Sequence, residues 1–254
     1  MGKRKIFLLL LLVLLCALCT GCEEKEEVKE TISTLTEVPV LPSFIPEPDR
    51  TVEEVDLPER YDYIEEGRVP LLRNQGDTNT CWAFASLSAL ETSKDEDMNG
   101  SFSADHLIYQ NPFGKNFEEG GAYVVTMSYL LSWKGPILEE TDPFDGESQD
   151  GLEPYLHVQE IRQSEPKDYE TIKKFVYLYG GVESAIYLDF DEYMIDSPYY
   201  DQEYNSYCYM GQEISNHDIV IIGWDDHFPA QNFANEVTSD GAFLCLNSWG
   251  EGFG

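Results

Sequence analysis

The sequence has 254 residues, of which 42% are apolar and 25% are charged, so the chain can bury a sizeable core. Its formal net charge of -32 excludes nucleic acid as a partner, because contacts to phosphates need a basic face. An acidic balance is typical of a soluble surface and by itself predicts no particular substrate.

The first 21 residues have the pattern of a signal peptide. A basic start at residues 3–5 precedes an apolar run over residues 6–18, which is too short to span a bilayer comfortably. The following Cys19-Thr20-Gly21-Cys22 resembles the signal of bacterial lipoproteins, and this resemblance implies cleavage before Cys22 and lipid on its sulfur. We therefore expect export and anchoring on the extracellular face of the cell membrane. Because Cys19 stands where such signals usually carry an aliphatic residue, simple secretion is the alternative.

Residues 22–56 are rich in Glu, Thr, Pro and Ser and have no helical or strand periodicity. This composition predicts a flexible, acidic and lipid-anchored tether.

Three cysteines remain beyond the leader, namely Cys81, Cys208 and Cys245. An odd count of three predicts no disulfide framework. Among these three cysteines no Cys-x-x-Cys or paired His–Cys spacing occurs, so we expect neither a metal site nor a cofactor. Cys245 alternates within an apolar run and is predicted to be a core residue, whereas Cys208 has no assignable role.

The stretch Gln75-Gly76-Asp77-Thr78-Asn79-Thr80-Cys81 places a cysteine at the start of a helical pattern, six residues after a side-chain amide. Apolar residues at helical spacing predict a helix over residues 81–94, and Asn79 and Thr80 are capping residue types. The positive end of the helix dipole favours a thiolate, which is the reactive form. The pattern predicts a thiol nucleophile, although a lone cysteine in this position is more often a small buried hydrophobe.

Further elements follow in chain order. Ser103 is expected to cap a short helix that contains His106, which we interpret as a structural histidine. Additional helices are expected over residues 122–134 and 168–179. Strands are expected over residues 182–188, 218–223 and 241–246. Helices in the first half and strands in the second predict an α+β fold.

The second half also supplies a candidate base and an orienting amide. His217 lies in Asn216-His217-Asp218, 136 residues after Cys81, and Asn247 follows 30 residues later in Asn247-Ser248-Trp249-Gly250. These separations fall within the range for papain-type enzymes. From about Leu57 to the last residue the chain resembles papain-like cysteine peptidases, and most of all the bacterial, surface-attached members.

The resemblance implies a papain-like fold with an active-site cleft between two halves. Residues 57–165 would form the mainly helical half with Cys81, and residues 166–254 a β-barrel-like half with His217 and Asn247. Relatives continue beyond Glu251-Gly252-Phe253-Gly254, so the sequence is expected to be truncated at its C-terminus.

The resemblance also implies catalytic roles. Cys81 is the expected nucleophile, His217 the proton shuttle, and Asn247 the residue that orients the imidazole. Gln75 is expected to donate to the oxyanion together with the Cys81 backbone N–H. Trp249 is expected to shield the hydrogen bond between His217 and Asn247 from water.

Three further residues are expected to contact substrate. In the family, the position of Gly120-Gly121 lets a substrate backbone approach and pair, although the dipeptide taken by itself slightly favours a plain turn. Asp218 is expected to line the pocket for the side chain two residues before the cut and to favour Lys or Arg there, unless it turns outward or is neutralised by a neighbour such as Ser215. Members of the family usually carry a disulfide between the positions that Thr78 and Glu118 occupy here. Because this chain has a cysteine at neither position, that disulfide is absent as a whole.

The sequence therefore predicts a cysteine-type endopeptidase that acts on protein or peptide substrates. Transglutaminases and cell-wall endopeptidases also use Cys and His, but their third residue is commonly Asp or His rather than Asn. The alternative from another class is a catalytically inactive surface binding or adhesion lipoprotein on the same scaffold. The sequence predicts no oligomeric state.

Overall fold

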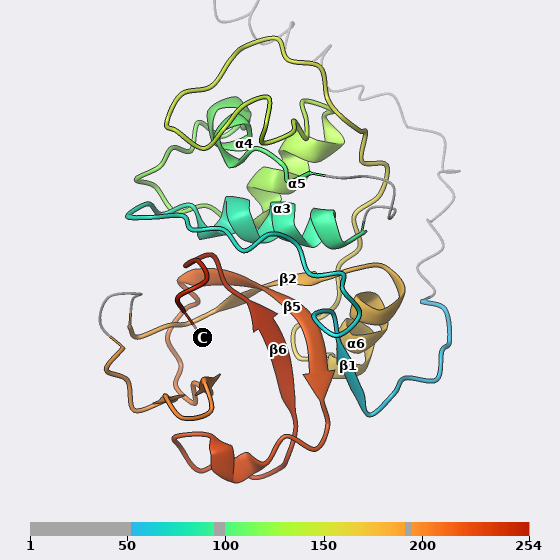
Figure 1. Ribbon diagram of the computed structural model, residues 1–254, viewed down its shortest axis with the longest axis vertical. Coiled ribbons are helices and arrows are strands. Elements are labelled where there is room, and N and C mark those ends of the chain that lie inside the picture. The colour runs from blue at the N-terminus through green and yellow to red at the C-terminus, as the bar shows by residue number, and fades with distance from the viewer. Residues whose placement is uncertain (1–51, 94–99, 191–194, 254) are drawn as a thin grey trace, which may run out of the picture. The chain divides into compact units, whose positions relative to one another are not determined.

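The computed structural model describes residues 52–93, 100–190 and 195–253 (Figure 1). The chain divides into two units, Met1–Thr51 and Val52–Gly254, and every described residue belongs to the second. The predicted signal peptide, Cys22 and most of the predicted tether therefore lie outside the described residues. Within the described part of the chain, no helix combines the length and apolarity needed to cross a bilayer.

In the second unit, the helices between residues 81 and 131 lie above the sheet, whereas the helix Tyr169–Leu178 lies beside the strands and shares their core (Figure 1). The helices are α3 (Cys81–Ser93), α4 (Ala104–Gln110), α5 (Tyr123–Leu131) and α6 (Tyr169–Leu178), with a short 3-10 helix, η1 (Ala230–Asn232). Figure 1 shows α4 and α5 on one side of α3 and the sheet on its other side. Ser103 caps α4 by accepting a hydrogen bond from the His106 N–H, as the sequence predicts.

The main sheet has four antiparallel strands around β5 (His217–Asp225). Its neighbours are β1 (Arg60–Asp62), β2 (Val182–Ile186) and β6 (Ala242–Leu246). β2 pairs with the first half of β5, so that Ile186 lies opposite His217 and Ala185 opposite Asp218. A separate hairpin joins β3 (Tyr200–Asp201) to β4 (Ser206–Tyr207).

The helix α3 contributes to both hydrophobic cores. Trp82, Phe84 and Leu87 belong to the core shared with α4 and α5, whereas Ala85 belongs to the core formed by the sheet and α6. The side chains from residue 82 to residue 88 are all buried. A helix that is apolar on every side is typical of such a central position. Packing on both sides of α3 holds its first residue, Cys81, in place.

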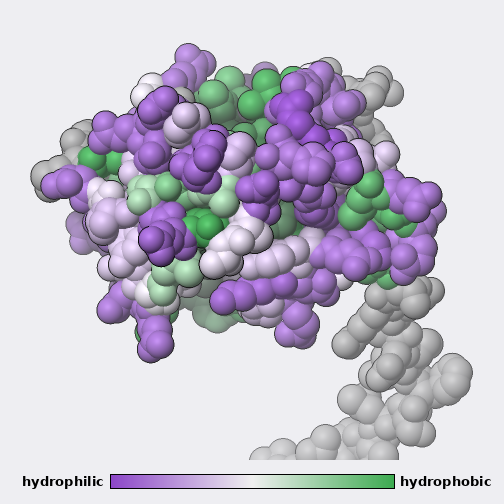
Figure 2. All heavy atoms as spheres, turned by 90° about the horizontal axis from the view of Figure 1, so that it is seen from below, coloured by the Kyte–Doolittle hydropathy of each residue, from purple (hydrophilic) through white to green (hydrophobic). Residues whose placement is uncertain are grey.

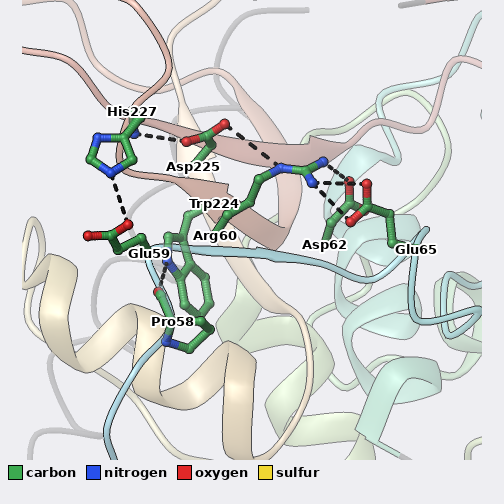
Figure 3. Close-up of polar contacts among 8 residues, drawn as sticks. All are labelled: Pro58, Glu59, Arg60, Asp62, Glu65, Trp224, Asp225 and His227. Atoms are coloured by element: carbon green, nitrogen blue, oxygen red, sulfur yellow. Dashed lines mark hydrogen bonds and ion pairs between the residues drawn. The ribbon is translucent and has the colours of Figure 1, made fainter.

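The strand β1 was not predicted, because its residues Arg60-Tyr61-Asp62 alternate between charged and aromatic side chains. Its backbone pairs with the end of β5, and its charged side chains bind neighbouring residues. Arg60 donates to Glu65 at 2.9 Å and to Asp62 at 3.2 Å, and Trp224 Nε1 donates to the Pro58 carbonyl oxygen at 3.1 Å (Figure 3).

Other sequence expectations differ from the structure in detail. The predicted strands 218–223 and 241–246 correspond to β5 and β6, and β2 ends two residues earlier than expected. Cys245 is exposed on β6, so its prediction as a core residue is wrong; alternation along β6 places Leu246 inward and Cys245 outward. Figure 2 shows a face on which hydrophilic residues predominate, as the acidic composition leads one to expect.

Candidate active site

Cys81 is the first residue of α3 and lies against the start of β5. Its side chain is half-buried, and the backbone N–H groups of Trp82 and Asp218 are directed at the sulfur. Burial raises the pKa of the Cys81 thiol to about 11, and these two N–H groups oppose the rise only in part. Burial therefore favours the thiol over the thiolate in this environment.

The His217 imidazole has one defined tautomer. Asn247 Oδ1 accepts hydrogen bonds from the Ser248 backbone N–H and from His217 Nε2, both at 2.8 Å. Because the backbone N–H can only donate, the shared atom is the amide oxygen, and His217 Nε2 must then carry a proton. In the neutral ring, Nδ1 is consequently the free base.

Burial also affects the charge of this ring. It lowers the pKa of His217 below its usual value, and the hydrogen bond to Asn247 offsets this in part. Among the described residues, no hydrogen bond joins the Cys81 sulfur to the imidazole. Burial thus acts against the charged forms of both the thiol and the imidazole.

The indole of Trp249 covers the imidazole. The ring centroids of His217 and Trp249 are 4.9 Å apart, and Phe253 packs on the indole at 4.7 Å. In general, an apolar cover can exclude water from a hydrogen bond beneath it.

Gln75 is held in a fixed orientation by its neighbours. Its Nε2 donates to the Thr78 carbonyl oxygen at 2.6 Å, and its Oε1 accepts from Ser248 Oγ at 2.6 Å. The Gln75 backbone N–H also donates to the Ser248 carbonyl oxygen at 2.8 Å. The amide nitrogen has a second hydrogen that these bonds do not use.

Ser248 is a site residue that the sequence analysis did not single out. Its backbone N–H fixes Asn247, and its hydroxyl fixes Gln75. One residue thus aligns the two amides of the site. Its place between Asn247 and Trp249 was the only signal that could have revealed it.

The dipeptide Gly120-Gly121 has two different environments. A Cβ added to Gly121 would lie 2.5 Å from the Trp82 ring, whereas one added to Gly120 would meet nothing within 4 Å. Gly121 is therefore required by the indole packed against it. Gly120 is exposed and leaves room beside the chain.

The loop that leads to Cys81 is tied to this glycine segment without a disulfide. The Asn79 backbone N–H donates to the Phe117 carbonyl oxygen at 2.8 Å, and Asn79 Nδ2 donates to the backbone carbonyl oxygen of Glu118 at 2.6 Å. These bonds lie where the family cysteines would be expected at Thr78 and Glu118.

Asp218 is buried and faces α3 rather than solvent. It lines a small cavity together with Val220 on β5 and residues of α3, including Phe84 and Ser88. Its carboxyl has no hydrogen bond or ion pair within the described residues. Burial raises the pKa of this carboxyl to about 6.

The remaining histidines lie in other environments. His106 is buried and its Nδ1 is 2.7 Å from the Tyr129 hydroxyl, in agreement with a structural role. His157 stacks on Trp133, and His227 pairs with Glu59 at the surface.

Residues 57–254 match the family described as papain family cysteine protease, which is most of the chain. The chain belongs to the papain family of cysteine proteases. The papain-like α+β fold expected from the sequence is confirmed by solved structures with the same fold. Among them is procathepsin L 3 of Tenebrio molitor, with 18% identity and a TM-score of 0.63 over 80% of this chain and 64% of that one.

Two other relatives of this papain-family chain are more similar in sequence. Cathepsin J of Mus musculus is 27% identical over 212 residues, which cover 79% of the chain and 59% of cathepsin J. Cwp84, a surface layer associated cysteine protease of Clostridium difficile, is 28% identical with a TM-score of 0.65, over 81% of the chain and 47% of that structure. The chain thus spans roughly half to three fifths of the length of these two relatives.

Proposed function

We propose that the protein is a cysteine-type endopeptidase with Cys81, His217 and Asn247 as its catalytic triad and Gln75 as an oxyanion donor. The observation that carries this proposal is the shared acceptor Asn247 Oδ1, which gives His217 a protonated Nε2 and a basic Nδ1. A base with this tautomer can accept the Cys81 proton. Family membership supports the same reaction class.

The reaction begins with transfer of the Cys81 proton to His217 Nδ1. The thiolate attacks the carbonyl carbon of the scissile bond, and the electron pair of the carbonyl moves to its oxygen. The Cys81 backbone N–H and the second hydrogen of Gln75 Nε2 stabilise that oxyanion. Collapse expels the amine, which takes the proton from His217, and water then hydrolyses the thioester with His217 as base.

The raised pKa of Cys81 and the lowered pKa of His217 affect the first step. Both shifts disfavour the thiolate–imidazolium pair in the unoccupied site. Proton transfer is then coupled to substrate binding, because the oxyanion donors act only when a carbonyl is present.

Labelling with an epoxide-type cysteine-protease inhibitor tests the proposal. We expect one label per chain at Cys81, and loss of both labelling and peptide cleavage in Cys81→Ala. His217→Ala should abolish turnover while leaving the fold intact. Cys208→Ala and Cys245→Ala are the matched controls and should keep both activities. Peptide turnover by Cys81→Ala would contradict the proposal.

The alternative is an inactive binding or adhesion lipoprotein on a papain-like scaffold. The presence of cysteine, histidine, asparagine and glutamine at all four expected positions favours the enzyme over this alternative. Failure of the wild-type protein to react with the epoxide, with peptide binding retained, would favour the binding protein.

We also propose that the protein is exported and lipid-anchored through Cys22 on the extracellular face of the cell membrane. The support is the sequence pattern at residues 1–22. A diacylglycerol supplies two chains on one sulfur, which suits stable anchoring. Cys22→Ser should move the protein from the membrane fraction to the medium or leave the leader uncleaved. Unchanged fractionation of Cys22→Ser would favour simple secretion.

For substrate binding, we propose that the backbone beside Gly120 and Gly121 pairs with substrate and that Trp249 shields the His217–Asn247 bond. We further propose that Asp218 contacts the side chain two residues before the cut and favours Lys or Arg. A buried carboxyl without a partner supports this, because a cationic side chain would supply the missing charge. Preference for Leu over Arg, unchanged in Asp218→Ala, would contradict it.

A further inference from the structure

A second buried carboxyl lies behind Asp218, on the neighbouring strand. Glu183 is in β2, opposite Val220 of β5, and Ala185 lies opposite Asp218. Residues directly opposite each other in an antiparallel pair point to the same face of the sheet, as do residues two apart in one strand. Glu183, Ala185 and Asp218 therefore share the face that packs on α3.

The carboxyl of Glu183 is held by α3. Ser86 Oγ donates to Glu183 Oε2 at 2.6 Å, whereas Glu183 Oε1 is shielded from solvent and has no hydrogen-bond partner in the described structure. Ser86 lies five residues after Cys81 in the same helix. This bond fixes the carboxyl at a defined distance from the nucleophile.

No cation of the described chain neutralises either carboxyl. On α6, which also packs on β2, Lys174 pairs with Glu54 and Glu170, and Lys173 pairs with Asp226. The titratable group on α3 that both carboxyls affect is Cys81. Arg73 lines the same cavity as Asp218, but its guanidinium pairs with Glu91 at 3.2 Å.

The electrostatic effects agree with this arrangement. Burial and the neighbouring Asp218 raise the pKa of Glu183 to about 8, and the Ser86 hydrogen bond opposes the rise. Both carboxyls in turn raise the pKa of Cys81. A cation placed beside Asp218 would favour the ionised form of both carboxyls and would offset their repulsion of the Cys81 thiolate.

Ala185 lies opposite Asp218 in the strand pair and two residues after Glu183 in β2. This residue is exposed although its partner Asp218 is buried. A methyl side chain in that position leaves space over the strand pair. A long substrate side chain that lies over Ala185 can bring its head group to Asp218, with Glu183 behind it.

We infer that Glu183 and Asp218 together form a two-carboxyl recognition site for a Lys or Arg side chain of the substrate, in which Asp218 pairs directly and Glu183 adds a second negative charge. The inference rests on the proposed peptidase function and adds a residue for which the sequence gave no functional signal. Glu183 is thus a specificity-determining residue rather than a catalytic one.

The inference predicts a pH-dependent selectivity. Near pH 5.5 Glu183 is protonated and Asp218 is largely protonated, whereas near pH 8.5 both are largely ionised and Lys keeps its charge. Selectivity for Lys over norleucine, which has a similar chain without the charge, should therefore rise with pH. Ionisation of Cys81 and His217 affects both substrates equally and cancels in the ratio.

The test compares kcat/KM for two fluorogenic peptides that differ only in Lys or norleucine two residues before the cut. For the wild type we expect the ratio to rise about tenfold or more between pH 5.5 and 8.5. Glu183→Gln should reduce that rise by about three- to tenfold, and Asp218→Asn should remove most of it. Glu160→Gln is the matched control, because Glu160 pairs with Arg162 at the surface.

A wild-type ratio that is flat with pH would overturn the inference, and this measurement does not depend on whether any variant folds. A ratio that changes in Asp218→Asn but not in folded Glu183→Gln would also overturn it, while leaving the role of Asp218 intact. Absence of both peptide cleavage and epoxide labelling in the wild type would instead refute the proposed peptidase function and, with it, this inference.

Discussion

The two sides of Cys81 are constructed differently. On one side, Gln75, Asn247 and Ser248 hold one another through hydrogen bonds of 2.6 to 2.8 Å. On the other side, Glu183 has a buried carboxyl oxygen without a hydrogen-bond partner. Asp218 is buried and its carboxyl has no ion pair among the described residues.

This difference separates the chemistry from the choice of substrate. Satisfied buried hydrogen bonds specify one geometry, which the reaction needs for every peptide bond. Unsatisfied carboxyls cost free energy until a suitable group arrives, so they can distinguish one side chain from another. Four measurements would break or sharpen the comparison.

The largest effect is expected from Gln75→Ala on the hydrogen-bonded side. Removal of an oxyanion donor lowers kcat by about 10²–10³, with little change in KM. Steady-state kinetics on a single peptide would measure this. Thr78→Val, which keeps the carbonyl that Gln75 contacts, is the control and should change kcat much less. An unchanged kcat in Gln75→Ala would remove Gln75 from the site.

The next effect concerns stability and the carboxyl side. The pKa of Glu183 is raised from 4.5 to about 8 on folding. Its contribution is therefore fully present below pH 4.5 and is lost as the pH rises through 8. Compared with the wild type, Glu183→Gln should gain on the order of 2 kcal/mol in unfolding free energy between pH 5 and pH 9. Urea unfolding at both pH values measures this, and parallel curves would contradict it.

A smaller effect on stability is expected at the glycine pair. Gly121→Ala should destabilise the fold by about 1–2 kcal/mol, because its Cβ would lie 2.5 Å from the Trp82 ring. Gly120→Ala is the matched control and should leave the melting temperature unchanged. If backbone pairing with substrate occurs here, Gly120→Ala should still raise KM. Equal stability losses in both variants would show that the Trp82 contact is not the cause.

The smallest effect is expected from the loop before Cys81. Asn79→Ala removes the side-chain bond to Glu118 and should cost about 1 kcal/mol of stability. Gln110→Ala removes an exposed amide bond to Asp150 and serves as control. The melting temperatures of the two variants would show whether the Asn79–Glu118 hydrogen bond stabilises the fold more than an ordinary surface bond does. Equal losses of melting temperature in both variants would contradict this.

Much of the fold could be predicted from the sequence because its elements are strongly patterned. The helix that begins at Cys81 and the strands that contain His217 and Leu246 all contain apolar runs. β1 could not be predicted, because its pairing with β5 satisfies the backbone of a short polar segment whose own side chains give no strand signal.

The candidate site divides in the same way. Residues within motifs, such as Cys81, His217 and Asn247, carry their own signal. Ser248 lies in a motif, but its function depends on contacts with a segment 173 residues away. Glu183 has no motif, and its importance arises only from the register that places it on the same face as Asp218.

The central position of α3 has a consequence for how the molecule unfolds. One side of this helix completes the core with α4 and α5, and the other completes the core with the sheet. Separation of either partner would expose apolar surface of the same helix, so the two cores are expected to lose their structure in one cooperative transition. Since the thiol lies at the end of that shared helix, peptidase activity and global structure should disappear together on heating.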